Sequence, residues 1–251
     1  MKKKILLMAF LAVGITAHAE TFVADDGDKT DGKSVIDLGK GKDDNDRWTM
    51  HAYGGVNVPT GVPDGMKFAP FRSWEFSLTV VQYDCTPKDW KTTFSAGIGV
   101  NWRTYTLSGH DKMFSKIGNN TKIGNNTMGI PEDFVVVGTP DTKLDNLSSN
   151  VHTTAFTMPL LIKQRFSKNF AISVGAQLNW NFYGRIHNYY EQGDNDIDVY
   201  TKKIGQRPFT VDVLGIVHVW KLGLYCKYSP MSVLKKDRGT EFKSLAFGIY
   251  L

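Results

Sequence analysis

Several apolar stretches of this 251-residue chain carry a charged residue at a position that alternates with apolar ones. Side chains two positions apart share one face of an extended strand, so each charge would lie on the polar face of its strand. The charges on such faces comprise two acids and four bases, namely Glu75, Asp212, Arg103, Lys163, Arg165 and Lys227. Together they predict a lumen polar network, which is either a path for a polar ligand or a packed set of ion pairs.

Serine and histidine side chains give little evidence of a catalytic site. The chain contains no Gly-x-Ser-x-Gly, no His-Glu-x-x-His and no phosphate-binding glycine loop. Three histidines, His110, His152 and His187, are expected near the outer rim of a barrel, and Ser108 is close to His110 in sequence. Because six histidines are spread over the chain, such proximity is expected by chance. We therefore predict no catalytic residue.

The acidic clusters are equally poor metal sites. Residues 194–198 alternate aspartate as a calcium loop does, but Val199 and Gly205 stand where that loop needs Gly and Glu. The clusters at 25–28 and 43–46 also lack the ligand spacing of such a loop. We predict no metal ion and no cofactor.

The elements that must position the charged set are strands. From Trp48 onward, apolar and polar residues alternate in runs long enough for a tilted membrane strand of about 9–11 residues. Eight such runs are expected, at 48–58, 72–84, 92–106, 151–165, 169–184, 207–219, 222–229 and 242–251. An even number of antiparallel strands lets a bacterial barrel close with both chain ends on one side.

The connections between these runs alternate between long and short without exception. In chain order they are 59–71, 85–91, 107–150, 166–168, 185–206, 220–221 and 230–241. A transmembrane barrel has this asymmetry, with long loops outside and tight turns in the periplasm, whereas a sandwich gives no reason for it. The predicted fold is an all-β, eight-stranded antiparallel up-and-down transmembrane β-barrel over 48–251, with long extracellular loops at 107–150 and 185–206.

Aromatic residues fall near the expected strand ends on the outward face. There an amphipathic ring suits the boundary between membrane and water. These residues are Trp48, Trp74, Trp102, Trp180, Phe182 and Phe209.

The N-terminal residues predict export. Three lysines, an apolar core over 5–16 and the small residues Ala17 and Ala19 form the pattern of a cleaved signal peptide over 1–19. The polar segment 20–47 is expected to be a disordered periplasmic lead-in. No later stretch has the run of about 18 apolar residues that a helical membrane span needs. The formal charge of +5 is too diffuse to indicate nucleic acid.

Three stretches resemble strands of the small outer-membrane β-barrel proteins of Bacteroidetes, often called porin-family or outer-membrane β-barrel domain proteins. They are FTMPLLIK (156–163), GLYCKYSP (223–230) and SLAFGIYL (244–251). The resemblance covers 48–251. It implies an eight-stranded barrel in the outer membrane, usually without an established activity.

The last strand has the features of an assembly signal. Its outward residues alternate up to the end of the chain, and they are Leu245, Phe247, Ile249 and Leu251. A barrel-assembly machine typically recognises such an edge strand by pairing with it, so we expect that machinery to be a partner during biogenesis. Outer-membrane lipid and lipopolysaccharide, whose phosphates suit the mild basic excess, are the other expected partners, together with a surface ligand of the long loops.

Three functions are consistent with these patterns. The first is a non-enzymatic integral outer-membrane protein, structural or surface-binding through loops 107–150 and 185–206. The alternative is a narrow channel for small solutes through the lumen, and a second alternative is a hydrolase or acyltransferase at the barrel rim. An eight-stranded barrel is only wide enough for side chains to fill it, and buried charges must pair, which favours the first.

Overall fold

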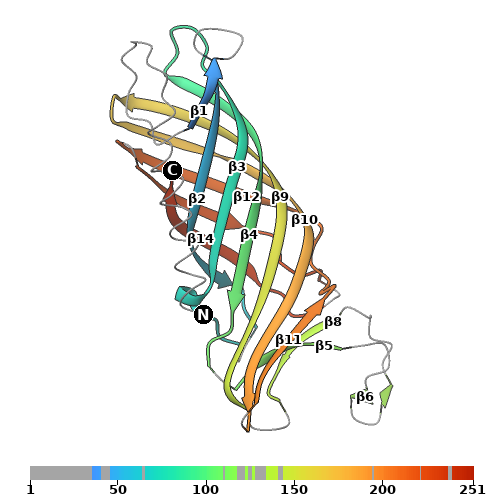
Figure 1. Cartoon of the computed structure of the whole chain (residues 1–251). Helices are drawn as coiled ribbons and strands as arrows, with labels where there is room; N and C mark the ends of the chain where they lie inside the picture. Colours follow the sequence, from blue (N-terminus) through green and yellow to red (C-terminus); the bar gives the residue numbers. More distant parts are fainter. Residues whose placement is uncertain are drawn as a thin grey trace.

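The computed structural model shows a chain built almost entirely of antiparallel strands (Figure 1). It describes residues 36–40, 46–63, 66–109, 111–117, 122–123, 126–127, 134–140, 144–193, 195–220, 222–236 and 239–251. The expected signal peptide and most of the expected lead-in lie outside these residues. Within them, no helix is long and apolar enough to cross a membrane.

Eight strands pair edge to edge into a closed ring, in the order β2, β14, β13, β12, β10, β9, β4, β3 and back to β2. Their bounds are Arg47–Thr60 (β2), Trp74–Cys85 (β3), Thr92–Thr106 (β4), Asp145–Ser167 (β9), Phe170–Gln192 (β10), Phe209–Val219 (β12), Leu222–Ser229 (β13) and Lys243–Tyr250 (β14). Each expected run corresponds to one of these strands, so the all-β, eight-stranded barrel-like fold is confirmed.

The two ends of the ring are built differently (Figure 1). At the turn end, short connections lie beside the start of β2 and the end of β14; they are 86–91, 168–169 and 220–221. At the loop end lie the longer connections 61–73, 107–144, 193–208 and 230–242. The first of these contains a short 3-10 helix, η1 (Pro70–Arg72).

The long connections contain more strand than the sequence predicts. Both β9 and β10 continue into the predicted loops 107–150 and 185–206. β11 (Asn195–Lys202) pairs back onto β10 as a hairpin, and further pairs form between β5 (Met113–Ile117) and β8 (Phe134–Gly138) and between β6 (Lys122–Ile123) and β7 (Asn126–Thr127). The sequence did not predict these strands; in β10 a bulge between Asn181 and Tyr183 shifts the alternation of polar and apolar residues just before the extension.

One further strand lies outside the ring. β1 (Ile36–Lys40) pairs with the start of β2, with Lys40 opposite Arg47. β14 does not reach this part of β2, since the backbone of Leu251 exchanges its hydrogen bonds with Ala52. The expected disorder of 20–47 is therefore wrong for 36–40, which pair with backbone groups of β2 beyond the reach of β14.

Two glycines face each other where the first and last strands of the ring meet. Gly55 of β2 is directly opposite Gly248 of β14. A Cβ atom on Gly55 would lie 2.1 Å from the carbonyl oxygen of Phe247, and one on Gly248 would lie 2.2 Å from that of Gly54. Any larger residue would push the two backbones apart, so this glycine seam allows the ring to close.

The wall of the ring is polar inside and apolar outside. The buried inward side chains are largely hydrophilic and include Asn57, Glu75, Asn101, Arg103, Gln177, Asn179, Asp212 and Lys227. The exposed outward side chains are largely hydrophobic and include Phe94, Ile98, Phe156, Leu160, Val174, Leu178, Val213, Val217, Leu224, Phe247 and Ile249. We call this outward set the apolar belt.

Candidate functional site

Four charged side chains meet in the middle of the lumen. Glu75 and Arg103 are directly opposite each other on β3 and β4, while Asp212 and Lys227 come from β12 and β13 on the other side of the ring. Successive side chains of a strand point to opposite faces, and all four of these point inward. Each is at most 5% exposed. We call them the lumen quartet.

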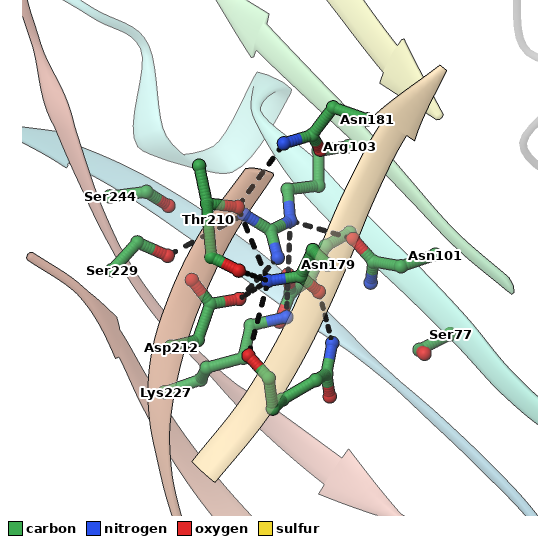
Figure 2. A network of polar contacts seen from close by, with 12 residues as sticks. Ser77, Asn101, Arg103, Asn179, Asn181, Thr210, Asp212, Lys227, Ser229 and Ser244 are labelled. Atoms are coloured by element: carbon green, nitrogen blue, oxygen red, sulfur yellow. Dashed lines mark hydrogen bonds and ion pairs between the residues drawn. The ribbon is translucent and has the colours of Figure 1, made fainter. Parts of the chain in front are cut away.

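The quartet forms a chain of ion pairs with no net charge; Figure 2 labels three of its members, Arg103, Asp212 and Lys227. The ammonium of Lys227 lies 2.6 Å from Oε2 of Glu75. Arg103 places Nε at 3.6 Å from the same oxygen and pairs through Nη2 with Oδ2 of Asp212. Each cation thus has a carboxylate partner, as buried charges require.

Uncharged polar groups complete the network around the quartet (Figure 2). Arg103 donates through Nε to Asn101 Oδ1 at 2.6 Å, and Asn179 Nδ2 donates to Asp212 Oδ2 at 2.9 Å. Lys227 donates to the hydroxyl of Tyr53 at 3.2 Å, and that hydroxyl donates to Gln177 Oε1 at 2.7 Å. Side chains of β2, β3, β4, β10, β12 and β13 are therefore joined across the lumen.

Two residues of the predicted lumen network lie apart from the quartet. Lys163 is half-buried and Arg165 is exposed, and neither forms an ion pair with a member of the quartet. Both lie nearer the turn end of β9, on the far side of Leu161. Leu161 belongs to a buried apolar layer with Tyr53, Leu214, Ile216, Tyr225, Ala246 and Tyr250. That layer separates the two parts of the lumen.

A serine–histidine pair lies at the turn end of the lumen. Ser173 Oγ is 2.8 Å from Nε2 of His218, while His51 Nε2 is 3.1 Å from Thr49 Oγ1. A nucleophilic serine must be reachable by substrate, yet Ser173 is only 3% exposed. Ser173 is therefore closed to solvent.

The histidines singled out by sequence lie near the loop end. His152 of β9 contacts Thr104 Oγ1 through Nδ1 at 2.8 Å, and His187 of β10 contacts Asp198 through Nε2 at 2.6 Å. His110 and Asp194 lie outside the described residues. Among the described residues, no group of three or more His, Cys, Asp or Glu side chains is placed to hold a metal ion.

An apolar cap, which the sequence did not predict, covers the loop end of the lumen. All four long connections contribute to it, together with the adjoining ends of β4, β9 and β10. Its buried members are Met66, Tyr105, Leu107, Phe114, Val135, Val151, Ile186, Ile204, Val233, Leu234 and Phe242. The available signal was the scatter of Met, Phe, Val and Leu in segments otherwise expected to be polar.

A small cavity separates the quartet from the cap. Its lining includes Arg103 of the quartet, together with Tyr105 and Val233 of the cap. It has room for about one water molecule. Quartet, apolar layer and cap thus obstruct the lumen at three levels.

No protein-family model, no curated protein and no solved structure matches this chain.

Proposed function

We propose that this chain is a non-enzymatic integral outer-membrane β-barrel protein that acts through the surface at its loop end. The observation that carries the proposal is the inversion of polarity across the wall. A water-soluble barrel exposes polar side chains and buries apolar ones, but here Val174 is 54% exposed while Asp212 and Lys227 are at most 1% exposed. A lipid surround removes the cost of such an exterior.

The aromatic residues support the proposal by their spacing. On the outward face of β10, Phe170 near the turn end and Trp180 toward the loop end are ten residues apart. At about 3.3 Å per residue and a tilt of about 40°, they are about 25 Å apart along the barrel axis. That is about the height of the apolar band of an outer-membrane barrel.

Other exposed aromatic residues lie at the same two levels. Trp48, Trp90, Phe94, Phe166 and Trp220 lie toward the turn end, and Trp102, Phe156, Phe182 and Phe209 lie toward the loop end. Phe156 packs on Trp180 with ring centroids 5.8 Å apart, and Trp180 stacks on Phe209 at 6.5 Å. Two aromatic girdles would anchor the barrel at the two membrane surfaces.

A charge in the apolar belt tests the membrane location. Val174→Arg places a guanidinium midway between the girdles, which costs about 2–4 kcal/mol in a bilayer. Val199→Arg on β11, beyond the loop-end girdle, is the matched control. We expect only Val174→Arg to reduce the heat-modifiable folded form in outer-membrane fractions. Equal recovery of both variants, or recovery of the native chain as a soluble periplasmic protein, would refute the proposal.

The obstructed lumen supports a surface role over transport. In a planar lipid bilayer we expect the purified protein to show no stable unitary conductance. Steady single-channel steps that change on Arg103→Gln would replace our proposal with the narrow solute channel.

A further inference from the structure

A row of basic side chains crosses the outer face of the wall at the loop end. Arg185 of β10 is directly opposite His152 of β9 on one side and Lys202 of β11 on the other. His152 shares its face of β9 with Phe156 and Met158, which are exposed members of the outward surface. The three residues therefore face outward, and we call them the basic row.

The basic row is short of anionic partners. Like charges directly opposite each other on neighbouring strands are destabilising, and Arg185 and Lys202 have this arrangement. A third cation is close, since the ammonium of Lys116 lies 3.5 Å from the carbonyl oxygen of Lys202. None of the described carboxylates forms an ion pair with Arg185, Lys202 or Lys116, and the nearby Asp198 is bound to His187.

Arg185 is held in place with part of its hydrogen-bonding capacity unused. Its guanidinium lies over the ring of Tyr200, with Cζ 5.3 Å from the centroid. Tyr200 is itself stacked on His187 at 4.4 Å. No hydrogen bond or ion pair of the described residues uses the guanidinium of Arg185; its Nε–H group is buried, so the donors that remain for an external anion are the terminal N–H groups. A fixed guanidinium with free donors is suited to bidentate binding of an oxyanion.

The basic row lies at the level where lipid phosphates are expected. His152 is four residues beyond Phe156 of the loop-end girdle. At about 3.3 Å per residue and a tilt of about 40°, this is about 10 Å along the barrel axis. Acidic residues of the same hairpin, Glu191 and Asp196, lie farther out toward its tip. Positive charge is thus concentrated next to the aromatic residues that mark the membrane surface.

We propose that the basic row binds a phosphate group of an outer-leaflet glycolipid, a lipopolysaccharide head group, between Arg185 and Lys202. The arginine supplies paired N–H donors and the lysine a second positive charge, so the phosphate relieves the repulsion between them. This inference rests on the proposed function, because it assumes an outer-membrane location.

Lipid binding to the purified, folded protein in detergent tests the inference. The probes are lipopolysaccharide, the same lipopolysaccharide after dephosphorylation, and sodium phosphate. The double variant Arg185→Gln/Lys202→Gln is compared with Lys235→Gln/Lys236→Gln, which removes two cations from another connection at the loop end. Native mass spectrometry counts bound lipid, and heat-modifiable migration on a gel confirms that each variant is folded. A charge-preserving exchange, Arg185→Lys/Lys202→Arg, covers the case in which the double variant misfolds.

We expect the Arg185→Gln/Lys202→Gln variant to bind lipopolysaccharide at least about tenfold more weakly, since each lost charge-assisted contact contributes more than an ordinary hydrogen bond. The lysine control should bind as the native chain does, and the charge-preserving exchange should bind more tightly than the Arg185→Gln/Lys202→Gln variant. Unchanged binding by the double variant, or equal binding of dephosphorylated lipid, overturns the inference. Saturation of the site by sodium phosphate at the same concentration also overturns it, in favour of a free-anion site. The proposed function is tested separately by Val174→Arg, so a failure of the lipid site can be told apart from a failure of the proposed function.

Discussion

The lumen quartet and the basic row both place cations beside one another, but they balance the charge in opposite ways. In the lumen, Lys227 and Arg103 each have a carboxylate partner, and the four charges sum to zero. On the outer face, Arg185 and Lys202 are opposite each other with no ion-paired carboxylate among the described residues. The charges in the lumen are thus balanced, whereas the outer face still has capacity for an anion.

This difference indicates where function resides. A buried ion network is costly to disturb, since it has given up its hydration and depends on every partner. A surface cluster stays hydrated and costs little to leave unpaired. We therefore expect changes in the quartet to alter stability and changes in the basic row to alter binding.

The largest effect is expected from Glu75→Gln. Lys227 would lose its 2.6 Å carboxylate partner while remaining buried, and Arg103 would keep only Asp212. Removing one partner of a buried pair costs about 3–5 kcal/mol. Guanidine unfolding of the refolded barrel in detergent, followed by tryptophan fluorescence, measures the loss. An unchanged midpoint would mean that the quartet is hydrated in solution.

A compensating pair of substitutions should have a smaller effect. Glu75→Gln combined with Lys227→Met removes the orphaned ammonium together with its partner. Because a buried ion pair and apolar side chains of similar volume often give similar stability, we expect the double variant to recover most of the loss. The same unfolding measurement applies, and losses that merely add would argue against direct coupling of the two residues.

Arg185→Gln should act in the opposite direction. Without lipid, it removes the repulsion between Arg185 and Lys202, and we expect a gain of about 0.2–1 kcal/mol. With lipopolysaccharide added, the order should reverse, since the native chain gains more stability from binding than the variant does. Unfolding curves of both proteins, recorded with and without lipid, measure the stability difference under each condition. A less stable variant in lipid-free detergent would show that Arg185 and Lys202 do not repel each other appreciably.

The smallest effect at neutral pH concerns His152, beyond the loop-end girdle. Burial, reinforced by the charges of Arg185 and His187, lowers the pKa of His152 from 6.5 to about 4. The folded chain thus binds this proton more weakly than the unfolded chain, so the contribution of His152 to stability is complete above pH 6.5 and is lost as the pH falls toward 4. Unfolding midpoints between pH 7.5 and 4 should fall less steeply for His152→Gln. Parallel curves for the two proteins would refute this.

The sequence predicts the barrel well because polar and apolar residues alternate over many positions, and such long alternation is typical of barrel strands. It predicts the inward direction of Glu75, Arg103, Asp212 and Lys227 for the same reason. It does not separate Lys163 from them, since alternation gives the face of a side chain but not its level along the lumen. The basic row was hidden because the bulge after Asn181 interrupts the alternation just before Arg185. The apolar cap was hidden because its residues belong to four connections that share no period.

The glycine seam also has a consequence for how the barrel forms. Gly55 and Gly248 come from opposite ends of the barrel sequence, so their pairing has the largest loop-closure entropy to overcome, and we expect it to form last. Until then β14 presents an unpaired edge that other strands can join. Gly248→Ala should therefore delay the heat-modifiable form in a pulse-chase, whereas Gly215→Ala, whose Cβ would lie 3.9 Å from its nearest neighbour, should not. In kinetic terms, we expect these two missing side chains to shorten the time that the nascent barrel spends open and prone to aggregation.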